Sequence, residues 1–96
     1  MNILIQYEGF VVARAGRVYN FLVIDALGEP RQFTVKVLSE SFRLTSLKFQ
    51  DGPPLCFELV KRELNRETQD SPAKAHLNIG AEEIQEYLER HSPRKR

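Results

Sequence analysis

Two side chains could together form a nucleophile and its base: the single cysteine, Cys56, and the histidine His76. The segment 51–54 (Asp-Gly-Pro-Pro) predicts a helix start, because proline is tolerated in a first helical turn. Cys56 would then lie near the helix N-terminus, where backbone N–H groups lower the pKa of a thiol. On a helical projection, however, Cys56 falls in the apolar arc between Leu59 and Val60. We therefore predict a core side chain. A Cys56-dependent enzyme or redox sensor is kept as the third hypothesis.

The two histidines have structural explanations. His76 falls in the polar phase of a short predicted strand, beside Asn78, where a lone histidine is usually a solvated side chain. His91 ends a predicted helix, and the negative end of a helix dipole stabilises a positive charge. Two isolated histidines and one cysteine do not supply the three or four ligands of a zinc site. We expect no metal site.

No other motif indicates catalysis or cofactor binding. Glu82, Glu83 and Glu86 cluster at a predicted helix start, where the positive end of the dipole explains them. The five glycines form neither G-x-G-x-x-G nor G-x-x-x-x-G-K-[ST], and G-x-S-x-G and H-E-x-x-H are also missing. We expect no catalytic residue, no cofactor and no cofactor-binding residue, so the sequence favours a protein that is not an enzyme.

The positive charge is concentrated at the C-terminus. The 14 basic and 13 acidic side chains give a net charge of +1, and without Arg94, Lys95 and Arg96 the balance of 11 against 13 is −2. Pro93 should end the last helix. We therefore predict a single compact domain over 1–92 and a flexible basic tail over 93–96.

That tail supports the second hypothesis, weak nucleic-acid binding. Tyr19 and Phe21 share the odd-numbered face of the longest predicted strand, where they could stack on bases. A helix packed over the same face is the competing explanation. Three cations give only weak, salt-sensitive attachment. The candidate partner contacts are Arg94, Lys95, Arg96, Tyr19 and Phe21.

Strand-like alternation dominates the first half of the chain, and helical periodicity begins at 51–54. Turns are expected at 15–16 and at 27–30, where glycine and proline supply the special backbone angles. Strands are predicted over 3–8, 10–14, 17–26, 33–37 and 47–49. After a polar loop over 68–72, a short strand is predicted over 75–79.

The last helix has the clearest start signal. With Gly80 as its N-cap, Ile79 and Ile84 take the two positions of a hydrophobic staple, and Glu83 takes the position of a capping-box carboxylate. The complete pattern predicts an α+β fold: a mainly antiparallel curved sheet of four to six strands, with two helices in the C-terminal half packed on one face.

The leading functional hypothesis is a small non-catalytic protein-interaction or regulatory module, which binds another protein through a sheet face or edge. An N-terminal edge strand could also pair with a second copy of the chain, which would give a homodimer. One cysteine excludes an intramolecular disulfide. Neither a signal peptide nor an apolar run of ~18 residues is present, so we expect a cytoplasmic protein without membrane contact.

Overall fold

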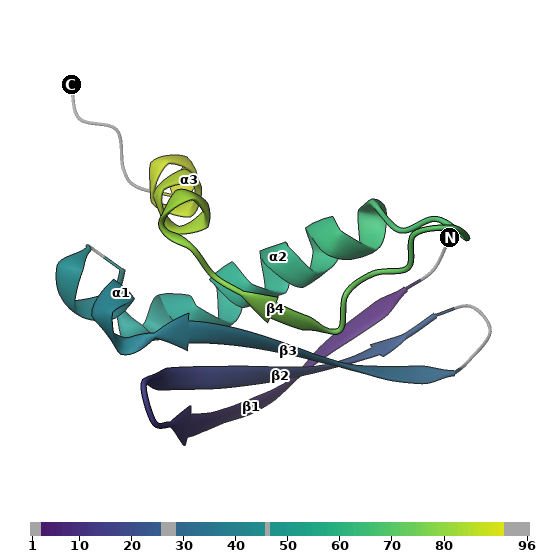
Figure 1. The fold of residues 1–96 in the computed structure, drawn as a ribbon, viewed down its shortest axis with the longest axis horizontal. Helices are drawn as coiled ribbons and strands as arrows, with labels where there is room; N and C mark the ends of the chain where they lie inside the picture. The colour runs from purple at the N-terminus through teal and green to yellow at the C-terminus, as the bar shows by residue number, and fades with distance from the viewer. Residues whose placement is uncertain (1–2, 26–28, 46, 92–96) are drawn as a thin grey trace.

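Four strands form one sheet, and helices of the C-terminal half of the chain cover it (Figure 1). The computed structural model describes residues 3–25, 29–45 and 47–91, and all structural statements refer to these residues. In chain order the elements are β1 (Leu4–Ala13), β2 (Gly16–Ile24), β3 (Pro30–Leu38), α1 (Ser39–Leu44), the 3-10 helix η1 (Phe49–Asp51), α2 (Gly52–Asn65), β4 (His76–Asn78) and α3 (Ala81–His91). The predicted α+β class is confirmed.

The sheet has the order β1-β2-β3-β4, with β1, β2 and β3 joined as an antiparallel meander. The three-residue strand β4 is parallel to β3, because the chain returns through helices between the two strands (Figure 1). The sheet is thus mostly antiparallel, as predicted, with one short parallel strand at its edge. Residues 27 and 28 of the predicted 27–30 turn lie outside the described residues, but the pairing of Ile24 with Pro30 fixes the β2–β3 register.

The two predicted N-terminal strands are one strand with a bulge. Tyr7 pairs with Phe21, but the next paired residue of β1 is Gly9, opposite Asn20, so Glu8 is an extra residue. Gly9 has a φ of 108°, a backbone conformation that favours glycine. The break predicted between 3–8 and 10–14 is therefore a kink within β1.

The strand predicted over 47–49 is wrong. Leu47 is a buried loop residue, and Phe49 begins the 3-10 helix η1. The backbone N–H of Lys48 donates to the Asp51 carboxylate at 2.9 Å, which closes this turn in place of a strand ladder. The short helix α1 was not predicted, since its six residues cover less than two helical turns and give no clear period.

The core lies between the odd-numbered face of β2 and β3 and the helix α2. Tyr19, Phe21 and the other inward residues of these strands are fully buried, and α2 supplies a matching apolar arc. We call this face of the sheet the helix face. The buried residues of the helix face are Tyr19, Phe21, Val23, Phe33, Val35 and Val37. The buried residues that α2 adds to the same core are Leu55, Cys56, Val60 and Leu64.

The predicted start of the last helix is confirmed. The Gly80 backbone N–H donates to the Glu83 carboxylate at 2.9 Å, and α3 begins at Ala81. Ile79 and Ile84 are both buried in the core, as the staple requires.

Gly52 lets the first turn of α2 pack directly on Tyr19. A methyl group at Gly52 would overlap the Tyr19 ring and hydroxyl, both held within the core. We expect G52A to lower the free energy of unfolding by about 1–3 kcal/mol, because the helix must shift to relieve the overlap. Urea unfolding followed by circular dichroism measures this effect. The matched control is G80A, whose added methyl meets only the end of the flexible Glu83 side chain. Equal stability of the two variants would contradict the packing described here.

Candidate interaction surface

The residues that the sequence marked for nucleophilic chemistry lie on opposite sides of the sheet. Cys56 is 0% exposed beneath α2, and burial raises the pKa of its thiol to about 12. His76 lies on the other face, where its Nδ1 is 2.8 Å from the Thr34 hydroxyl. The prediction that Cys56 belongs to the core is confirmed, and the geometry provides no contact between this thiol and His76.

Tyr19 and Phe21 do not form an open stacking platform. Both rings are 0% exposed, since Gly52 packs on Tyr19 and the Phe57 ring of α2 lies 6.5 Å from that of Phe21. The competing explanation, a helix over this face, is therefore confirmed. The tail residues Arg94, Lys95 and Arg96 lie outside the described residues.

Exposed hydrophobic side chains gather on β1, which is an edge strand of the sheet (Figure 1). Nine large hydrophobic side chains are exposed in the described part of the chain, and six of them fall between positions 3 and 12. Such concentration on one edge is typical of an interaction site. We call these six residues the β1 edge surface: Tyr7, Phe10 and Val12 on the helix face, Leu4 and Val11 on the opposite face, and Ile3 just before the strand.

The aromatic part of this surface rests on the core. The Tyr7 ring lies 5.3 Å from that of Phe21, and the Phe10 ring lies 5.5 Å from that of Tyr19. Phe57, on α2, adds another exposed ring beside Phe21. The exposed rings are therefore supported from below by buried rings, which holds them in place before any partner binds.

Arg17 fixes one end of the aromatic surface. Its guanidinium lies 4.3 Å from the Phe10 ring centroid and 3.9 Å from that of Phe49. The Phe49 ring in turn packs 4.7 Å from Phe42 of α1. This cation–π arrangement ties the β1–β2 hairpin to α1 and η1. Sequence reasoning missed it, because it joins residues from four elements.

Sequence reasoning also missed the β1 edge surface, although a signal was present. The run Phe10, Val11, Val12 is apolar in both phases of a strand, which is typical of a strand covered on both faces. Among the strands of the described residues, β1 has only β2 as a neighbour, and Val12 is 77% exposed. The apolar run was therefore visible in the sequence, whereas its position at an edge was not.

Two cationic side chains line a depression beside α1. The depression has a volume of about 580 Å³, and Arg43, Lys48 and the exposed ring of Phe49 contribute to its lining. Arg14 lines a smaller depression that shares Arg43. None of these three cations forms an ion pair with another described residue.

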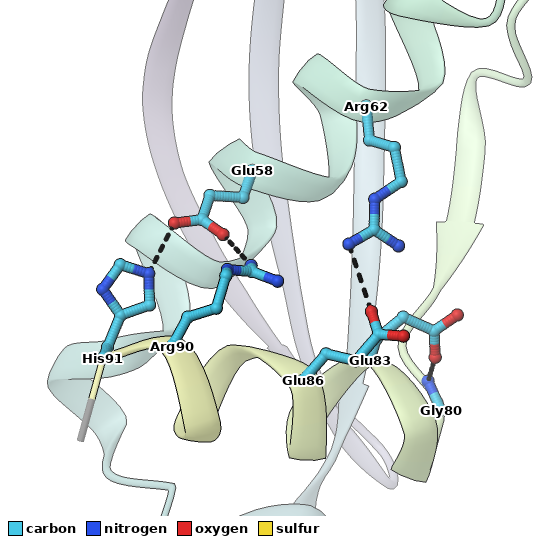
Figure 2. Close-up of polar contacts among 7 residues, drawn as sticks. All are labelled: Glu58, Arg62, Gly80, Glu83, Glu86, Arg90 and His91. Atoms are coloured by element: carbon cyan, nitrogen blue, oxygen red, sulfur yellow. Dashed lines mark hydrogen bonds and ion pairs between the residues drawn. The ribbon is translucent and has the colours of Figure 1, made fainter. Parts of the chain in front are cut away.

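Polar contacts also join α2 to α3 (Figure 2). Glu58 accepts hydrogen bonds from Arg90 and, at 2.8 Å, from His91 Nε2. Arg62 pairs with Glu86 at 3.3 Å. Partial burial by itself would raise the pKa of Glu58, but the bonds from Arg90 and His91 outweigh it and hold the pKa below its ordinary value. These pairs hold α3 against α2, and each contributes only ~0–1 kcal/mol because it is partly exposed.

The pKa of Cys56 leads to a chemical prediction. A thiol with a pKa near 12 has about a thousandfold less thiolate at neutral pH than one with the ordinary value of 9.0. We expect iodoacetamide to label the native thiol at least that much more slowly than the denatured thiol. Fast labelling of the native protein would restore the redox-sensor hypothesis.

The same shift gives the stability a pH dependence of known sign. The unfolded thiol loses its proton near pH 9 while the folded thiol keeps it, so the contribution of Cys56 to stability is full below pH 9 and is lost as the pH rises towards 12. The control variant C56A should lose less stability over this interval in urea unfolding.

Comparison with protein-family models, with curated proteins and with solved structures finds no significant match for this chain. Within the described ranges, no group of three or more histidine, cysteine, aspartate or glutamate side chains could hold a metal ion. None of the described helices is long and apolar enough to cross a membrane. What the chain binds must therefore be inferred from its own surfaces.

Proposed function

We propose that this protein is a non-catalytic protein-interaction module that binds a polypeptide strand along β1. The observation that carries the proposal is the β1 edge surface, which combines an unpaired strand edge with six of the nine exposed large hydrophobic side chains. A strand added to a sheet edge gains main-chain hydrogen bonds, and side-chain pockets supply specificity.

The composition of β1 supports this use. An edge strand that must remain unpaired is usually short, or carries lysine or proline. β1 has ten residues, contains neither lysine nor proline, and has Glu8 as its one charged residue. At the other edge, β4 has three residues, of which His76 and Asn78 are polar and exposed. The strand β1 is therefore the edge suited to binding.

A site-specific photocrosslinker tests the proposal. With p-benzoylphenylalanine in place of Val12, irradiation in a lysate of the source organism should give a discrete protein adduct. Excess wild-type protein without the crosslinker should compete for the captured partner, or become the captured partner itself where the partner is a second copy of the chain. V12K should do neither, because a lysine would be desolvated at an apolar edge.

The matched control carries the crosslinker at Lys61, an exposed position of α2. It should give no such adduct. Equal adducts at both positions, or none at Val12, would overturn the proposal.

A second candidate function is weak binding of single-stranded nucleic acid at the depression beside α1. Exposed Phe49 next to Arg43 and Lys48 is a suitable combination, since bases stack on aromatic rings while cations contact phosphates. This site replaces the buried Tyr19 and Phe21 as the aromatic contact. The tail residues Arg94, Lys95 and Arg96 remain part of this candidate.

Charge reversal tests the second candidate. We expect R43E and K48E each to weaken the binding of labelled oligothymidylate several-fold, with a smaller salt dependence, because each removes a phosphate contact. Fluorescence anisotropy over a salt series measures both quantities. Deletion of residues 94–96 shows the share of the tail, and K61E is the control. Binding that R43E and K48E leave unchanged would reject the site.

A further inference from the structure

We infer that the occupant of the β1 edge is β1 of a second copy of this chain, paired antiparallel about a two-fold axis perpendicular to the sheet. The inference rests on the proposed function, because it names the strand that the β1 edge binds. The axis would place both α2 helices on the same side of a continuous sheet.

The bulge sets which residues of β1 share a face. Before it, Ile5 and Tyr7 pair with Val23 and Phe21 on the helix face. After it, Phe10 pairs with Tyr19 and Val12 with Arg17 on the same face. The helix-face residues therefore change from odd to even numbers across Glu8 and Gly9.

This change makes β1 complementary to itself. Opposite residues of an antiparallel pair lie on the same face of the sheet. A two-fold pairing that uses all ten residues sets Leu4 opposite Ala13, so any two partner positions add up to seventeen. In a regular strand this register would oppose odd and even positions, which lie on different faces. In β1 the bulge brings each pair onto one face: 4 with 13, 5 with 12, 6 with 11, 7 with 10, and 8 with 9.

The resulting contacts are apolar on the helix face. Tyr7 would lie opposite Phe10 of the second copy, and Ile5 opposite Val12. Each contact occurs twice, which brings four aromatic rings together at the centre of the interface. Val12 is the most exposed large hydrophobic residue among those described, and this register covers it.

The register also accommodates the one charged side chain of β1. Glu8 would face Gly9, which has no side chain, instead of a second Glu8. Its carboxylate already accepts a hydrogen bond from Gln32 of the same chain at 2.8 Å. A regular partner strand, in contrast, leaves one β1 residue unpaired at the bulge, as β2 does. A second copy of β1 has the same extra residue, so this pairing would leave no β1 residue unpaired at the bulge.

The mass in solution is the first test. Light scattering after size exclusion should give twice the 11.1 kDa of one chain for purified wild-type protein. V12K should give the mass of one chain, with a circular dichroism spectrum equal to that of wild type. The matched control L38K replaces another exposed hydrophobic residue, two strands away from the β1 edge, and should stay dimeric.

Cysteine crosslinking tests the register. Positions 6 and 11 lie opposite each other across the axis, within the Cα separation of ~4.4–6.8 Å that a disulfide needs. Under oxidising conditions, Q6C mixed with V11C should give a covalent dimer, while neither variant alone should do so. A mixture of Q6C with K61C is the control and should stay uncrosslinked.

Each outcome decides between the two proposals. A dimer that V12K dissociates, with the crosslink between 6 and 11, supports the inference. A monomer at all concentrations, a dimer indifferent to V12K, or a crosslink of V11C to itself overturns it. If the Val12 photocrosslinker then captures a different protein under the same competition, the proposed function stands without the dimer. If it captures nothing, both are overturned.

Discussion

The packing of one helix on two strands is the constraint from which the rest of the molecule follows. An α-helix with its side chains is ~10–12 Å wide, and strands lie ~4.8 Å apart. One helix therefore covers about two strands, and here the inward side chains of β2 and β3 are buried in one core with those of α2. Gly52 sets how closely α2 approaches, since it lies directly on Tyr19. The outer strand β1 is left only partly covered, so the exposure of Tyr7, Phe10 and Val12 is a consequence of how the core is built.

The second long helix does not relieve this exposure. α3 follows β4 at the opposite edge of the sheet, and its buried residues Ile84 and Tyr87 extend the core there (Figure 1). Leu88 also packs against the core, and polar contacts add to these, with Glu58 joined to Arg90 and His91 (Figure 2). Because such partly exposed pairs are individually weak, α3 depends on its two buried anchors and on the cap at Gly80. The ion pairs of α2 and α3 thus join charged groups within the chain, whereas the large hydrophobic side chains of the β1 edge surface stay exposed in the described structure.

Much of this fold could be predicted from local patterns. The alternation in β3, the start of α2 at 51–54 and the staple of Ile79 with Ile84 each depend on neighbouring residues, so the sequence contains them. The parallel direction of β4 and the position of β1 at an edge depend on how distant segments meet, which no short window records. The candidate surface was missed for the same reason: Phe10 to Val12 looks like a buried run unless one knows that, among the described strands, β2 alone lies beside it.

The bulge at Gly9 connects the fold to the proposed interaction. Bulges usually protect an edge strand by bending it away from partners. In β1 this protection acts against regular strands, which lose one backbone pairing at Glu8, as β2 does. A strand with an equivalent bulge loses none and also matches the change of face between Tyr7 and Phe10. The same distortion therefore disfavours most strands and favours one, so specificity can arise in a strand that has a single charged residue. β1 has no lysine or proline to keep other strands from pairing with it. The bulge in its backbone would exclude regular strands in their place.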